Sequence, residues 1–144
     1  MVAQNKSKKF DICEVLSAVT SLRLSSQGLG GFYAVLEHMT GSEIYTNQVD
    51  RAQGSQVKLI CKQHPKLQNR FSQERLAKLS EQLQRRTSKP SRVRAVKAYL
   101  RAMSRAHGQH LALERSPSIS YNPMDPFEEF ALMYGRTDAI VIAR

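Results

Sequence analysis

The spacing of apolar residues predicts that most of the chain is helical. Ile12, Val15, Leu16 and Val19 recur three or four positions apart, which places their side chains on one face of an α-helix. Similar spacing, with polar caps before it and glycine or proline after it, predicts about six helices. We expect them after Asp11, from Phe32 to Met39 with a stop at Gly41, from a cap at Thr46 or Asn47 to His64, over residues 72–86, from Ser88 and Pro90 to Gly108, and from Asp125 and Pro126 to Gly135.

Two short segments near the C-terminus favour strands instead. Residues 110–114 read HLALE, and residues 139–143 read AIVIA, an apolar run with the β-branched residues that are enriched in strands. Each segment is the natural partner of the other. The predicted fold class is therefore mainly α (about six helices) with a small two-stranded β element near the C-terminus, and an α+β fold is the alternative. On the last helix, the residues expected to face inward are Phe127, Phe130, Ala131 and Met133.

A chain of 144 residues suits one domain. Residues 1–9 are polar and basic, so we expect a flexible basic N-terminus before a single domain over residues 10–144. No apolar run approaches the roughly 20 residues of a membrane helix, and no apolar segment follows the basic N-terminus as in a secretory signal. We therefore expect no membrane contact. Cys13 and Cys61 lie on apolar stripes, which favours free, buried thiols in a reducing compartment.

The formal net charge of +10 changes this picture, because it favours contact with an anionic partner. No acidic residue occurs between Arg85 and Arg105. On a helical wheel the apolar side of this helix holds Val93, Val96, Tyr99, Leu100 and Met103, and Arg94, Lys97, Arg101 and Arg105 cover the roughly opposite edge. The predicted partner-binding residues are Arg85, Arg86, Lys89, Arg92, Arg94, Lys97, Arg101 and Arg105.

The sequence leaves two interpretations of this basic block open. It is either a solvated face of a basic protein or a contact surface for nucleic acid or an acidic protein. Most exposed helices mix charge signs, because like charges one turn apart repel; an unrelieved basic face therefore favours an anionic partner over a merely solvated surface. Tyr99 belongs to the apolar side, so the face lacks the interleaved aromatic residues of single-strand binders. If the partner is a nucleic acid, we expect contact with its phosphates.

The segment from Gly30 to Ala52 gathers residue types that can do chemistry, including Glu37, His38, Asp50 and Arg51. Glu37 and His38 are adjacent, so on a helix they diverge. The histidines share no metal-ligand spacing with the cysteines, and no phosphate-binding glycine motif occurs. We therefore expect no catalytic residue, no metal and no cofactor, and hence no enzyme. The expected roles are structural: Tyr45 anchors the next helix, and Asp50 and Arg51 cap or pair locally.

Several short strings resemble a family of small uncharacterised proteins encoded by bacteriophages. They are VLS at residues 15–17, MTG at 39–41, the TNQVDRA segment at 46–52, and the HP pair at His64 and Pro65. The later string NPMDPFEEFALM, followed by an apolar strand, also looks like the C-terminal end of those proteins. The resemblance covers about residues 10–66 and 120–143, and it leaves out the basic helix. No activity or catalytic residue comes with it.

The resemblance implies a phage or prophage setting in the cytoplasm of a bacterial host cell. Small phage accessory proteins often bind and block a host machine, so the expected function is a non-enzymatic, anti-CRISPR-like accessory protein. It would inhibit or redirect a host protein or ribonucleoprotein complex, such as a nucleic-acid-guided defence system. The alternative is a DNA- or RNA-binding protein that acts through the basic helix. The sequence leaves the oligomeric state open.

Overall fold

The computed structural model describes residues 7–134 except 21, 23 and 25–29. Within that part, the helices are α1 (Ile12–Thr20), α2 (Gly30–Thr40), α3 (Val49–Gln63), α4 (Arg70–Arg85), α5 (Lys89–His107) and α6 (Pro126–Tyr134). The strands are β1 (Ser7–Asp11) and β2 (His110–Glu114), and three 3-10 turns are η1 (Thr46–Gln48), η2 (Pro65–Gln68) and η3 (Ser118–Ser120). The predicted fold class, mainly α with a two-stranded β element, is confirmed.

The partner of β2 differs from the prediction. β2 pairs antiparallel with β1, in a register that sets Phe10 opposite Leu111 and Asp11 opposite His110. Residues 7–9 therefore belong to the sheet and are not part of a flexible N-terminus. Burial of Phe10 favours this pairing, because its side chain lies in the core and contacts the tilted His38 ring, with ring centroids 5.3 Å apart. The expected strand over residues 139–143 lies outside the described residues.

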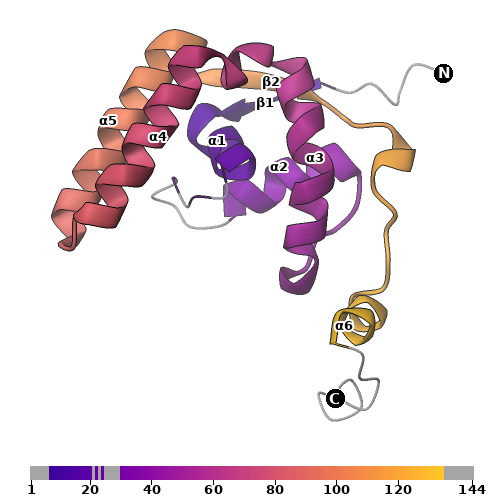
Figure 1. The fold of residues 1–144 in the computed structure, drawn as a ribbon. Coiled ribbons are helices and arrows are strands. Elements are labelled where there is room, and N and C mark those ends of the chain that lie inside the picture. Colours follow the sequence, from indigo (N-terminus) through magenta and orange to yellow (C-terminus); the bar gives the residue numbers. More distant parts are fainter. Residues whose placement is uncertain (1–6, 21, 23, 25–29, 135–144) are drawn as a thin grey trace.

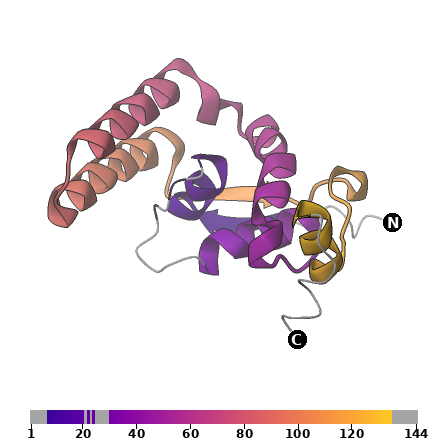
Figure 2. The same cartoon turned by 60° about the horizontal axis from the view of Figure 1, so that its bottom comes forward.

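The core lies between the sheet and helices α1, α2 and α3 (Figure 1). Its largest fully buried side chains include Leu16, Leu36, Met39, Ile60 and Leu113. Because these residues come from four elements at helical or strand spacing, they fix how α1, α2, α3 and β2 pack. The helix α4 and its neighbour α5 lie side by side at one end of the molecule, and α6 lies at the other (Figures 1 and 2).

Most predicted helix ends agree with the structure, and two need correction. Ser88 caps α5 by accepting a hydrogen bond from Ser91 N at 3.3 Å, and Gly108 ends it with φ +98°. The helix α4 begins at Arg70, two residues earlier than predicted, because Asn69 Oδ1 accepts from Ser72 N at 2.8 Å. The helix α3 begins after the turn η1, so neither Thr46 nor Asn47 is its cap.

The predicted burial of α6 is wrong for two residues. Phe127 is 54% exposed and Met133 is 52% exposed, and Phe130 and Ala131 are half-buried. The side chain that α6 buries is Glu129, 4% exposed. The helix is therefore held against the rest of the molecule by a polar contact, which an apolar pattern cannot reveal.

Candidate partner-binding surface

The basic residues sit on a helical hairpin formed by α4 and α5. Pro90 suits the first turn of α5, where its missing N–H costs nothing. Two of the predicted binding residues hold the turn together. Arg86 Nη1 donates to Ser91 O at 3.1 Å, and Arg92 Nη1 donates to Arg86 O at 3.1 Å and to Leu83 O. These guanidinium groups hydrogen-bond to backbone carbonyls of the hairpin turn, so we call Arg86 and Arg92 the hairpin frame.

The helix α5 buries a slightly different face from the one that the wheel predicts. Tyr99 and Met103 are buried as expected, together with Ala95. Val93 is 40% exposed, and Val96 and Leu100 are only half-buried. The small side chain of Ala95 allows α5 to pack closely at that position. The buried face is therefore centred on the side that carries Ala95 and Tyr99, and Val93 lies at its margin. This arrangement leaves an apolar strip of α5 partly open.

Arg94, Lys97, Arg101 and Arg105 form what we call the basic edge. All four side chains are exposed, as predicted for the edge opposite the core. None of them takes part in an ion pair with another described residue. Arg94 and Arg105 are eleven residues apart in the helix, or about 16 Å at a rise of 1.5 Å per residue. The basic edge is thus a row of four exposed cations on one helix, without an ion-pair partner among the described residues.

Three of the other four predicted residues, Arg85, Arg86 and Arg92, already have partners within the chain. Arg85 forms an exposed ion pair with Glu81 at 3.1 Å, one turn earlier on α4. Lys89 is exposed at the start of α5. With Arg86 and Arg92 in the turn, the structure divides the eight predicted residues into a hairpin frame and a free surface. The sequence alone could not make that division, because it depends on contacts with backbone carbonyls.

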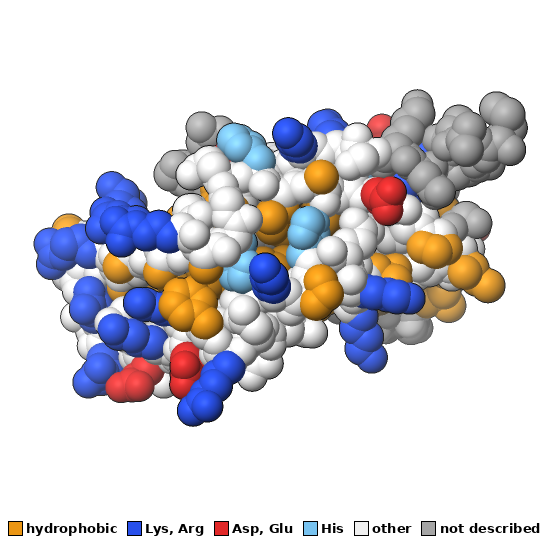
Figure 3. All heavy atoms as spheres, turned by 90° about the horizontal axis from the view of Figure 1, so that it is seen from above, with side chains coloured by type: hydrophobic (Ala, Val, Ile, Leu, Met, Phe, Trp, Pro, Cys, Tyr) orange, Lys and Arg blue, Asp and Glu red, His pale blue; other side chains and the backbone are white. Residues whose placement is uncertain are grey.

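Nearly all of the net charge of the chain lies on this hairpin. Residues 70–107 hold eleven Lys or Arg and two Glu, so they carry nine of the ten net positive charges. Seen from above, Lys and Arg side chains gather at this end, with apolar side chains between them (Figure 3). The charge distribution can be counted from the sequence, but its concentration on one projecting element depends on the fold.

The segment from Gly30 to Ala52 gathers residue types found in active sites, and in the structure their side chains make structural contacts. Glu37 Oε2 accepts from Ile44 N at 3.1 Å, and His38 Nε2 lies 2.7 Å from Leu113 O. Tyr45 is expected to anchor α3, but the residue is 48% exposed and serves the turn through its backbone. Its N–H donates to Gln48 Oε1 at 3.1 Å, and its carbonyl oxygen accepts from Gln48 N at 2.8 Å. These contacts bring no nucleophile and base together.

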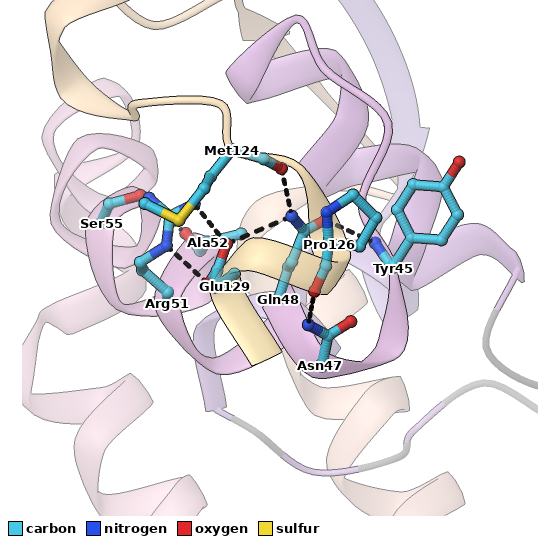
Figure 4. A network of polar contacts seen from close by, with 9 residues as sticks. All are labelled: Tyr45, Asn47, Gln48, Arg51, Ala52, Ser55, Met124, Pro126 and Glu129. Atoms are coloured by element: carbon cyan, nitrogen blue, oxygen red, sulfur yellow. Dashed lines mark hydrogen bonds and ion pairs between the residues drawn. The ribbon is translucent and has the colours of Figure 1, made fainter. Parts of the chain in front are cut away.

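Arg51 does not pair locally, which corrects the prediction. Its Nε and Nη2 donate to the two carboxylate oxygens of Glu129 at 2.7 and 2.8 Å, which links α3 to α6 (Figure 4). Gln48 Nε2 donates to Met124 O at 2.7 Å in the same network. The hydrogen bonds from Arg51 lower the pKa of the Glu129 carboxyl and, in return, the pKa of Arg51 is raised.

One serine and histidine approach each other elsewhere, at the base of the hairpin. Ser72 Oγ lies 2.8 Å from His107 Nε2 and donates to Lys66 O at 2.9 Å. Since the hydroxyl hydrogen goes to the carbonyl, His107 supplies the hydrogen of the other contact. Ser72 is also 2% exposed. The pair therefore ties α4 to the end of α5 and does not present a nucleophile.

The two thiols differ in exposure. Both cysteines are free, and Cys61 is buried, whereas Cys13 is only half-buried, which corrects the expectation that both are buried. Burial raises the pKa of each thiol, and contacts with Asp11 and Glu14 add to the rise that brings Cys13 to about 12. Among the described residues, no three His, Cys, Asp or Glu side chains are grouped to hold a metal ion.

Comparison with known proteins bears only on the first half of the chain. Residues 10–70 match the model of a family described as a domain of unknown function, DUF7736. The match covers less than half of the chain and ends at the first residue of α4, so the basic edge and α6 lie beyond it. Searches of curated proteins and of solved structures found no match. Within the described part of the chain, no helix is both long and apolar enough to cross a membrane.

Proposed function

We propose that this chain is a non-enzymatic binding protein that engages an anionic partner through the basic edge of α5. The observation that carries the proposal is the row of four exposed cations, Arg94, Lys97, Arg101 and Arg105, none of which is in an ion pair with a described residue. Like charges at one-turn spacing repel and cost helix stability. An anionic partner relieves that repulsion, so the edge is more stable in a complex than alone.

The proposed partner is a complex of a bacterial host cell. The resemblance to small phage-encoded proteins supports this setting, in which an accessory protein inhibits or redirects host machinery. A nucleic-acid-guided defence complex offers both kinds of anionic surface, acidic protein patches and bound nucleic acid. Nine of ten net positive charges on one hairpin would steer the chain toward either surface. Masking of such a surface is the proposed mode of inhibition.

The second candidate is direct binding to DNA or RNA through the same edge. It is favoured by the absence of acidic residues on α5. The edge carries no aromatic side chain on which a base could stack, so this mode would rest on phosphate contacts. Such binding would depend steeply on salt and little on sequence.

A pull-down from host lysate, with and without nuclease, separates the two candidates. Recovery of one protein complex that resists nuclease supports the inhibitor, and loss of all bound material supports the nucleic-acid binder. The key variant reverses the edge (Arg94→Glu, Arg101→Glu and Arg105→Glu together). The control reverses three other exposed lysines, Lys58, Lys62 and Lys66, and so changes the net charge equally. If both variants recover the same material as the unmodified chain, the basic edge is not the binding surface.

A further inference from the structure

An apolar groove lies beside the basic edge. It has a volume of about 680 Å³ and is bordered by α5, the end of α4, and residues that follow α1. Val93, Val96 and Leu100 form the α5 wall, and Leu22 and Leu24 form part of the facing wall. Typical ligand sites have volumes of about 300–1,000 Å³. The groove can therefore take several apolar side chains of a bound molecule.

Among the described residues that line the groove, the charged ones are Lys89, Arg92 and Lys97, and none is acidic. Arg92 is held by the carbonyls of the hairpin turn, which leaves the amines of Lys89 and Lys97 exposed at the rim. Lys97 also belongs to the basic edge, so groove and edge form one continuous surface. An occupant that fits both features must be apolar on one side and acidic on its flank.

We propose that this groove binds an acidic amphipathic helix of the protein partner, with its apolar side chains inserted and its carboxylates facing Lys89 and Lys97. Helices dock in apolar grooves through anchors spaced three and four residues apart. A nucleic acid fits less well, because none of the described lining residues is an aromatic one on which a base could stack, and aliphatic walls gain nothing from phosphates. The inference rests on the proposed function and narrows its partner to a protein.

The test uses the full chain and a defined probe. The probe is a fluorescent helical peptide of about 16 residues with leucines on one face and glutamates on both flanks. Its matched control replaces every glutamate by lysine. Fluorescence anisotropy should show saturable binding of the acidic probe, with the basic control at least about tenfold weaker, a difference of about 1.4 kcal/mol. No binding at about 1 mM probe, or equal binding of both peptides, would overturn the proposal.

A pair of variants tests whether the probe occupies the groove. Val93→Asp places a carboxylate in the wall, and the fold should tolerate it because Val93 is 40% exposed. The control is Ile119→Asp, at a position that is 94% exposed and does not line the groove. Val93→Asp should weaken binding about tenfold or more, and Ile119→Asp should not change it. Equal affinity of both variants would place the probe elsewhere and refute the groove.

The same variants separate the two proposals when applied to the host complex. If reversing the basic edge abolishes recovery but Val93→Asp leaves the affinity for the complex unchanged, the groove proposal fails and the proposed function stands. If edge reversal leaves recovery unchanged, the proposed function fails whatever the probe does. A short duplex DNA that binds the chain when the acidic probe does not would overturn the helix proposal in favour of nucleic acid.

Discussion

Arg51 on α3 and Glu129 on α6 form a two-point ion pair, with donor–acceptor distances of 2.7 and 2.8 Å, across 78 residues of sequence. The Glu129 side chain is 5% exposed and the Arg51 side chain is 36% exposed. Two parallel hydrogen bonds fix orientation as well as distance. This contact positions α6, whose large apolar side chains Phe127, Leu132 and Met133 are more than half exposed.

Glu129→Gln should release α6 without unfolding the domain. An amide cannot accept two charged hydrogen bonds, so the loss should be about 1–2 kcal/mol, given that Arg51 is partly in solvent. Hydrogen exchange of the α6 backbone amides should accelerate, and that of α1 and α2 should not. The control is Glu128→Gln, because Glu128 is exposed on the same helix. Unchanged exchange in α6 would show that other contacts hold it.

The same ion pair predicts a dependence on pH. Because the folded-state pKa of Glu129 is lowered from its ordinary value of 4.5, the ionised carboxylate stabilises the folded state above that value. This stabilisation should be lost as the pH falls below 4.5 and through the lowered pKa. Protection of α6 should therefore decrease in acid, and Glu129→Gln should remove that part of the dependence. An identical pH profile in both proteins would exclude Glu129 as the titrating group.

Phe10→Ala tests the contribution of β1, whose pairing with β2 is not predicted from the sequence. Removal of a buried phenylalanine ring costs about 3–5 kcal/mol, and each kcal/mol lowers the melting temperature by about 2–8 °C in a domain of this size. We expect a decrease of about 10 °C or more. The control is Lys9→Ala, one residue earlier and exposed. Equal melting temperatures of the two variants would mean that β1 contributes little to the fold.

Thiol labelling tests the environments of the cysteines. The thiolate is the reactive form, and both thiols have raised pKa values, Cys13 to about 12. Labelling of the native protein near pH 7.5 should be slow at both positions and fast in denaturant. Labelling at both positions should accelerate as the pH rises toward the raised pKa values, because the thiolate fraction increases. Cys13→Ser and Cys61→Ser variants assign the two rates, and rapid native labelling of Cys61 would contradict its burial.

The elements that could be predicted are those that depend on nearby residues. Ser88 with Pro90, and Gly108 after it, mark the ends of α5 because a cap acts within one turn. The strand β1 could not be predicted, since SKKFD contains one apolar residue and so has no periodicity. Its pairing depends on the burial of Phe10 beside His38, which is a tertiary contact.

In the candidate site, too, features set by nearby residues could be predicted and features set by tertiary contacts could not. The exposure of Arg94, Lys97, Arg101 and Arg105 follows from helical spacing and was predicted. The commitment of Arg86 and Arg92 to backbone carbonyls depends on how the hairpin turns. The groove exists because α5 buries Ala95 and leaves Val93 40% exposed. A helical wheel centred on the larger apolar residues instead predicts that Val93 is buried.

The central claim is that the basic edge is the binding surface, and equilibrium binding of the recovered host partner by two charge-reversed chains tests it most directly. Reversing Arg94, Arg101 and Arg105 should weaken affinity about a hundredfold or more, at roughly 1 kcal/mol for each reversal. Reversing Lys58, Lys62 and Lys66 should leave it within about threefold at physiological salt, because charges farther than about 8 Å from the partner are screened. An equal loss in both variants, or no loss in either, would contradict a role for the edge beyond its contribution to net charge.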